Sequence, residues 1–344
     1  MPLEQYELAK KALNSSQVIA FPTETVMGLG VLFDDEGAYK LLNKIKRRPE
    51  DKPYTLMVSS VIEIDKYAYL TLRDRQIINK FMPGPLTVLL NAKENIPGYV
   101  THGTGIIGIR VPDMLNIRDM IDFVGKPLLV PSANRSGEKP LTTYKEVEKE
   151  FGSELGFIYK EDSHMGKPST ILDLTGSDVK IIREGPISLK DIKRSLINMR
   201  IAIGSDHGGL DYKEAIKKHL QDAGHEVIDV GTNNYDSCHY PVYGIAVGEK
   251  VASGECQFGV VVCTSGEGIA IAANKVKGIR CGIGYNDDVA RLMREHNDAN
   301  VISFGQKFME LNDVIRRVDI FLTTKFAGGR HEIRVNLIKE EENK

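Results

Sequence analysis

The sequence predicts two α/β domains that follow one another along the chain. Its 344 residues exceed what one hydrophobic core usually organises. At Met199 a hydrophobic strand leads into a glycine-rich turn, residues 199–209, which is how an α/β domain often begins. Strand-like and helix-like segments alternate on both sides of this point. We therefore expect one domain over residues 1–198 and a second over residues 199–344.

The composition is typical of a soluble protein. Hydrophobic residues make up 42% of the chain and charged residues 27%, the formal net charge is −2, and no long apolar run occurs. The N-terminal residues do not show a basic region followed by an apolar stretch, so we expect a cytoplasmic protein with no membrane contact. The spacing of the cysteines fits neither a zinc site nor a disulfide framework, which predicts free thiols and no bound metal.

Two features of the first half suggest a ligand site. An apolar strand over residues 17–22 ends in Pro22-Thr-Glu-Thr25, and small residues follow, which lets a ligand approach the backbone. A helix from about Gly37 then leads to Lys46, Arg48 and Lys52. Cations at this spacing favour phosphate binding, whereas the alternative is a solvated helix end where basic residues complement the helix dipole.

Further polar blocks lie mostly at predicted strand ends. They are residues 82–87, 108–112, 131–137, 168–171 and 182–185. With the blocks above, they resemble the YrdC-type threonylcarbamoyl-AMP synthase family across residues 5 to about 190. The resemblance implies a twisted α/β sheet with a wide positive groove, in which L-threonine, bicarbonate and ATP form threonylcarbamoyladenylate and pyrophosphate. This adenylate serves a tRNA adenosine modification, so tRNA and tRNA-modification proteins are expected partners.

The same resemblance implies roles for individual side chains and for ATP with Mg²⁺. It assigns Lys46 and Arg48 to phosphate and bicarbonate, Lys52 and Arg110 to the threonine carboxylate, Thr25, Ser132 and Ser169 to the rest of threonine, and Thr104, Asn134 and Arg183 to ATP. Met27 stands where the family usually has an aromatic residue. The alternatives are a module that holds RNA without catalysis, and carbamoyl transfer as in hydrogenase maturation.

The second half predicts a doubly wound parallel sheet. Its expected strands are 199–205, 225–230, 258–263, 279–284 and 300–304, and its expected helices are 210–223, 242–253, 268–275 and 287–295. Ligands bind such sheets beyond the carboxyl ends of the strands. There the sequence has Asp206 and His207, the turn that starts at Cys263, and His296 with Asn297.

Cys263 and a pair of arginines are the strongest single candidates in this half. Cys263 ends an apolar strand, and the glycine-containing turn after it opens a helix, which favours a thiolate and anion binding by free N–H groups. The alternative is a small buried hydrophobe, which is how we interpret the other three cysteines. Arg330 and Arg334 lie four residues apart on a predicted helix and suit a sugar phosphate, unless they are ordinary surface arginines.

These blocks, together with residues 272–275 and 294–298, resemble the ribose-5-phosphate isomerase B and galactose-6-phosphate isomerase family over residues 199–340. The resemblance implies aldose–ketose isomerisation without metal or cofactor, at a site between two subunits of a homodimer or tetramer. It assigns proton transfer to Cys263 with Ser265, ring opening to His296 with Asp206, the enediolate or a hydroxyl to Asn297, phosphate to His207, Arg330 and Arg334, and further substrate contacts to Gly266, Gly268, Tyr240 and Lys307.

Three departures from the family pattern leave the choice of sugar open to alternatives. Ser265 stands where threonine is common, His239 where aspartate is common, and Lys307 where arginine is common. Because Cys263, His296 and both arginines are present, ribose 5-phosphate is the preferred substrate. Galactose 6-phosphate, allose 6-phosphate and a purely dimerising role are the alternatives. The whole sequence thus predicts a bifunctional enzyme.

Overall fold

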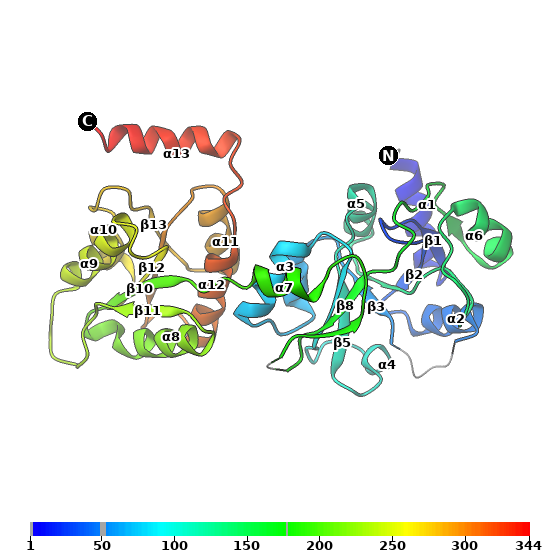
Figure 1. The fold of residues 1–344 in the computed structure, drawn as a ribbon, viewed down its shortest axis with the longest axis horizontal. Coiled ribbons are helices and arrows are strands. Elements are labelled where there is room, and N and C mark those ends of the chain that lie inside the picture. The colour runs from blue at the N-terminus through cyan, green and yellow to red at the C-terminus, as the bar shows by residue number, and fades with distance from the viewer. Residues whose placement is uncertain (1–2, 49–52, 177) are drawn as a thin grey trace. The chain divides into compact units, whose positions relative to one another are not determined.

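The computed structural model describes residues 3–48, 53–176 and 178–344. They form two compact units, one of Met1–Leu70 and Ile77–Ser195 and the other of Thr71–Gln76 and Leu196–Lys344. Both units are built from helices packed on a β-sheet (Figure 1). The predicted α/β class is therefore confirmed for both halves.

The first unit holds a mixed sheet in the order β7-β1-β2-β6-β3-β5-β4-β8-β9. Its strands are β1 (Ile19–Phe21), β2 (Gly28–Leu32), β3 (Thr55–Met57), β4 (Leu86–Asn91), β5 (Ile106–Arg110), β6 (Leu128–Val130), β7 (Phe157–Ile158), β8 (Thr170–Asp173) and β9 (Lys180–Arg183). Strands β1/β7, β3/β5 and β4/β8 pair in parallel, and the other neighbours are antiparallel.

Helices and short helical turns connect these strands. They are α1 (Leu3–Asn14), α2 (Glu36–Lys46), η1 (Val61–Lys66), α3 (Leu72–Phe81), α4 (Gly98–Thr101), α5 (Leu115–Val124), α6 (Tyr144–Phe151), η2 (Gly152–Glu154) and α7 (Leu189–Ser195). Leu13 of α1 and Ile121 of α5 are fully buried against Phe21 and Leu128 of the sheet. This core supports the strands whose ends carry the polar blocks.

The second unit is a parallel sheet in the order β11-β10-β12-β14-β13. Its strands are β10 (Arg200–Ser205), β11 (Glu226–Asp229), β12 (Phe258–Cys263), β13 (Cys281–Ile283) and β14 (Val301–Gly305). Its helices are η3 (His207–Gly209), α8 (Leu210–Asp222), α9 (Tyr240–Ala252), α10 (Glu267–Ala273), α11 (Asp287–Glu295), α12 (Leu311–Thr323) and α13 (Arg330–Glu341). The predicted strands and helices are all found, with ends shifted by a few residues.

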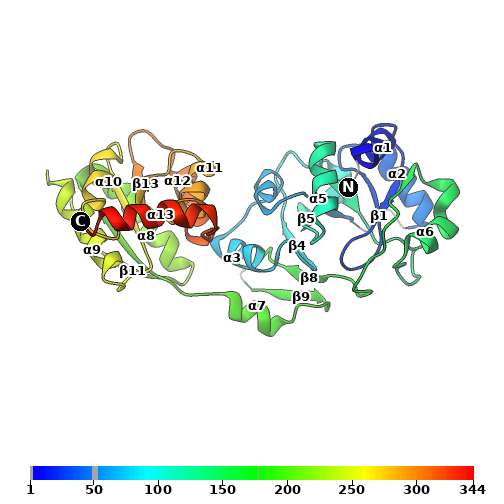
Figure 2. The same ribbon diagram turned by 90° about the horizontal axis from the view of Figure 1, so that it is seen from above.

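Apolar side chains point alternately to the two faces of this sheet along each strand, which explains why helices cover both faces (Figure 2). Ile201 and Ile203 pack with α8, α11 and α12, whereas Ala202, between them, packs with α9 and α10. Such two-sided burial requires strands that are apolar at nearly every position. None of the described helices combines the length and the apolar character that a membrane crossing requires.

Candidate functional sites

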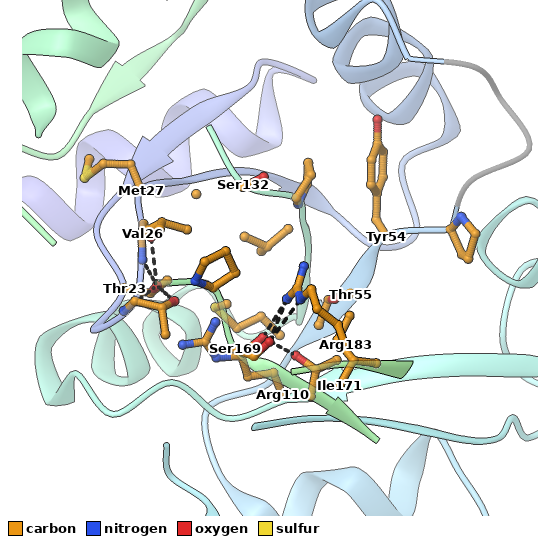
Figure 3. Close-up of a pocket in the computed structure, with 18 of the residues that line it drawn as sticks. Thr23, Val26, Met27, Tyr54, Thr55, Arg110, Ser132, Ser169, Ile171 and Arg183 are labelled. Atoms are coloured by element: carbon orange, nitrogen blue, oxygen red, sulfur yellow. Dashed lines mark hydrogen bonds between the residues drawn. The ribbon is translucent and has the colours of Figure 1, made fainter. Parts of the chain in front are cut away.

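The first unit has a pocket lined by side chains from strand ends and loops (Figure 3). Its polar lining consists of hydroxyls and guanidinium groups: Thr23, Thr25, Thr55, Thr87, Ser132 and Ser169 with Arg48, Arg110 and Arg183. The described lining residues include no carboxylate. The pocket therefore favours an anionic ligand that also accepts hydrogen bonds.

Arg110 is the most deeply buried of these cations. It is the last residue of β5, only 6% of its surface is exposed, and its Nη2 lies 2.8 Å from Glu24 Oε1. Its buried Nε has no hydrogen-bond partner among the described residues. An unsatisfied buried donor is costly, and a bound carboxylate or water would satisfy it.

Arg183 and Arg48 are held by neighbouring groups at the pocket wall. Arg183, at the end of β9, donates from Nε and Nη2 to Ser169 O, at 3.1 and 2.9 Å, and from Nη2 to Ser169 Oγ at 3.1 Å. Burial lowers the pKa of Arg183, and the charge of Arg110 lowers it further. The Arg48 guanidinium lies over the Tyr54 ring, 4.9 Å from its centroid.

The fold of α2 explains how Arg48 reaches the pocket. Asp35 caps the helix by accepting a 2.8 Å hydrogen bond from Ala38 N, and Arg47 ends it in the left-handed conformation, with a φ of 49°. The chain therefore turns sharply just before Arg48. Of the predicted basic cluster, Arg48 lines the pocket and Lys46 does not.

The pocket hydroxyls are paired with one another. Thr23 Oγ1 and Thr25 Oγ1 are 2.7 Å apart, and Thr87 Oγ1 and Ser169 Oγ are 2.9 Å apart. Thr23, Thr55 and Thr87 line the pocket although the sequence did not single them out. Thr23 and Thr87 belong to recognised blocks, so a signal for them existed, whereas Thr55 belonged to none.

Several side chains expected to bind ligands lie outside the described pocket lining. Lys46 Nζ and the Asn134 amide already bond to backbone carbonyls, and Thr104 Oγ1 donates to Thr101 O at 2.6 Å. Lys52 lies outside the described residues. Met27, the departure from the family pattern, does line the pocket and is fully buried.

In the second unit, polar loops meet at the carboxyl ends of β10, β12 and β14, which are neighbours in the sheet. A side-chain Cβ at Gly208 would stand 2.2 Å from Thr264 Oγ1 and 3.3 Å from Thr264 N, so the loops after β10 and β12 are in close contact. Burial raises the pKa of Asp206, whose Oδ1 accepts a 3.1 Å hydrogen bond from Gly208 N. Asp206 thus lies beside the Cys263 turn, as predicted.

The Cys263 thiol faces the backbone of the turn that follows it. Only 5% of Cys263 is exposed, and its Sγ accepts a hydrogen bond from Gly266 N at 3.1 Å. Gly266 has a φ of 86°, and Ser303 Oγ fixes the turn by donating to Gly266 O at 2.5 Å. The backbone N–H of Gly266 therefore points at the Cys263 sulfur.

Other predicted residues surround this turn. A Cβ at Gly268 would stand 2.7 Å from the Tyr240 ring, so that ring lies directly over Gly268. Ser265 Oγ accepts from Glu267 N at 3.3 Å, and Lys307 N donates to Thr264 O at 3.1 Å. The structure therefore brings Ser265, Gly268, Tyr240 and Lys307 to the same edge as Cys263.

Cys238 departs from our expectation of an ordinary packing residue. Its N–H donates to His207 Nδ1 at 3.2 Å, and its Sγ lies 3.8 Å from the same nitrogen. Burial opposes ionisation of this thiol, but hydrogen bonds with Tyr243, His207 and Thr232 outweigh burial and lower its pKa. Its sequence neighbours gave no signal, because the contact with His207 is non-local.

His296, Asn297, Arg330 and Arg334 form a second group, around the end of α11 and the start of α13. The His296 and His331 rings are stacked, with centroids 4.0 Å apart and planes at 5°. Burial lowers the pKa of His331, and His296, Arg330 and Arg334 lower it further. Across the described chain, no hydrogen bond, ion pair or ring contact joins this group to Cys263 or Asp206.

Two families match the chain in succession. The family described as Telomere recombination (Sua5, YciO and YrdC proteins) matches residues 11–185, and the Ribose/Galactose Isomerase family matches residues 201–338. A putative threonylcarbamoyl-AMP synthase of Methanocaldococcus jannaschii is 35% identical over 189 residues, which cover 55% of this chain and 89% of that protein.

The second half also has relatives with a similar percentage of identical residues. The putative sugar phosphate isomerase YwlF of Bacillus subtilis is 41% identical over 147 residues, covering 42% of this chain and 99% of that protein. The solved structure of ribose-5-phosphate isomerase B from Clostridium thermocellum is 48% identical, covers 42% of this chain and 98% of that one, and has a TM-score of 0.42. The chain therefore belongs to the Sua5/YciO/YrdC family over its first half and to the ribose/galactose isomerase family over its second.

Proposed function

We propose that the chain is a bifunctional enzyme. Its first unit forms L-threonylcarbamoyladenylate from L-threonine, bicarbonate and ATP, and its second unit interconverts ribose 5-phosphate and ribulose 5-phosphate. The observation that supports the first activity is the convergence of Arg48, Arg110 and Arg183 on one pocket. The second is supported by Cys263, whose sulfur accepts from Gly266 N at a strand end.

In the first reaction the pocket residues stabilise negative charge. The threonine nitrogen bonds to the bicarbonate carbon and water leaves, which gives a carbamate. A carbamate oxygen then bonds to the α-phosphorus of ATP while the bond to the β-phosphate bridge breaks and pyrophosphate leaves. Arg110 would hold the threonine carboxylate, and Arg48 and Arg183 would stabilise charge that develops on the phosphates.

The hydroxyls of Thr25, Ser132 and Ser169 suit the rest of threonine. No group of three or more His, Cys, Asp or Glu side chains in the described parts of the chain could hold a metal ion. Mg²⁺ would accompany ATP on its phosphates. The adenylate would pass to tRNA-modification proteins in the cytoplasm.

In the second reaction Cys263 moves one proton. The thiolate removes the proton on C2 of the open-chain aldose, which gives an enediolate whose oxygen is stabilised by N–H groups of the 264–268 turn. The hydroxyl proton then moves from O2 to O1, and the thiol returns its proton to C1. Asp206 with His296 would assist ring opening, and His207, Arg330 and Arg334 would bind phosphate. Because the His296 group is not joined to Cys263 within one chain, we propose that a second copy completes each site.

The deciding experiment measures ribose 5-phosphate and ribulose 5-phosphate interconversion by the full chain in EDTA. We expect turnover in wild type and a loss of at least about a hundredfold in Cys263→Ala, since general base catalysis contributes that much. Cys256→Ala, which removes another buried thiol of the same hydrophobic cluster, is the matched control. No turnover in a folded wild-type chain would reject this substrate, and galactose 6-phosphate and allose 6-phosphate would then be tested.

A further inference from the structure

Lys46 is a buried cation that the proposed chemistry does not use. It is the last residue of α2, and only 1% of it is exposed. Its Nζ donates to Ser132 O at 2.5 Å and to Asn134 O at 2.6 Å, and it lies 3.4 Å from Asn134 Oδ1. Burial lowers the pKa of Lys46 to about 7, and the charges of Arg48 and Arg135 contribute. A buried ammonium held by backbone oxygens is already satisfied.

The oxygens that Lys46 binds belong to a loop, residues 131–136, that forms one wall of the pocket. Pro131 and Ser132 line the pocket, and Ser132 Oγ donates to Asn134 Oδ1 at 2.6 Å. Lys46 also accepts at its own backbone oxygen from Ser136 N, at 2.8 Å. The end of α2 is therefore hydrogen-bonded to this loop through both the side chain and the backbone of Lys46.

We propose that Lys46 is a positioning residue, which acts by fixing loop 131–136 so that Ser132 faces the pocket, and not by contacting phosphate or bicarbonate. To reach a phosphate, its ammonium would have to leave the Ser132 and Asn134 carbonyls, and two backbone oxygens would lose their donor. The choice of L-threonine and ATP as test ligands rests on the proposed function of the first unit. The role of Lys46 in fixing the loop does not depend on that function.

A double-mutant cycle tests this role, with L-threonine and ATP binding measured by calorimetry. The variants are Lys46→Met, Ser132→Ala and the double variant. If Lys46 acts through Ser132, the losses are not additive: each single variant weakens L-threonine binding about tenfold, and the double variant weakens it by about the same factor. Additive losses of about a hundredfold, or a loss confined to ATP, would show an independent contact and overturn the proposal.

Amide hydrogen exchange without any ligand gives a second readout. Ser136 N–H and Ala133 N–H, which donate to Lys46 O and Met27 O, should exchange faster in Lys46→Met but not in Arg48→Met, which removes a pocket-lining cation. Unchanged exchange would contradict the proposal even if wild type binds neither ligand, so failure of the proposed function is distinguishable. If Lys46→Met does not fold, Lys46→Gln and Lys46→Ala are compared instead. Because Lys46→Gln keeps N–H donors, the Ser136 and Ala133 amides should exchange more slowly in it than in Lys46→Ala.

Discussion

At the scale of single residues, environment separates side chains of the same type. Cys281 is half-buried, and burial of its thiol raises the pKa to about 12. Cys263 is also buried, yet a backbone N–H points at its sulfur. Cys238 contacts His207. Burial thus keeps one thiol neutral, one thiol accepts a backbone hydrogen bond, and one lies against His207.

Arg110 provides a residue-scale prediction for the first unit. Arg110→Lys replaces a planar fork with a point charge at a buried site that already has an ion pair to Glu24. We expect the KM for L-threonine to rise by roughly tenfold or more, because a bidentate contact to the carboxylate is lost. Steady-state pyrophosphate release measures this effect.

The matched control is Arg194→Lys, an exposed arginine of α7 outside the pocket. It should leave the KM for L-threonine unchanged. Isomerisation of ribose 5-phosphate should be unaffected in both variants. An equal loss of the isomerase activity in Arg110→Lys would mean that the substitution acts through general unfolding.

At the scale of elements, the second sheet was predictable because each strand and helix has a strong local pattern. Helix α12 was not predicted, although Val314, Val318 and Phe321 repeat at helical spacing and are fully buried. The order of strands in the first sheet was also not predictable. Its mixed pairing joins strands far apart in the sequence, and no local spacing encodes such contacts.

The packing of α8 against α12 includes a titratable pair. His219 Nε2 lies 2.7 Å from Asp319 Oδ1, and Asp319 is only 3% exposed. The hydrogen bond to Asp319 raises the pKa of His219 above 6.5, against the effect of burial. A raised pKa in the folded state stabilises the fold fully below the unfolded pKa, and this stabilisation is lost as the pH rises through the folded pKa.

We therefore expect the free energy of unfolding of wild type to be higher than that of His219→Gln. The difference should be largest below about pH 6.5, which is the unperturbed pKa of histidine. The difference should shrink at higher pH. Urea unfolding of both proteins between pH 5.5 and 9 measures it. Burial lowers the pKa of His225, and the charge of His219 lowers it as well, so both proteins are compared in a His225→Gln background. A difference that does not change with pH would show that Asp319 does not stabilise protonated His219.

At the scale of the whole molecule, each unit has its own sheet and its own buried core. We expect residues 1–198 and residues 199–344, produced separately, each to retain one activity within a few-fold of the full chain. Adenylate formation and pentose-phosphate isomerisation are assayed on each piece alone and on their mixture. If the second piece folds as a dimer yet does not isomerise, the two activities are not independent.

The sequence by itself determined the two-part organisation, the parallel α/β pattern of the second half, and the placement of Cys263 at a strand end. Periodicity and turn residues carry this information because they are local. Only the tertiary structure decided that Lys46 faces a loop while Arg48 faces the pocket, that Cys238 meets His207, and that His296 stacks on His331. The direction of a side chain and its distant neighbours depend on how the elements pack, which no local pattern in one sequence specifies.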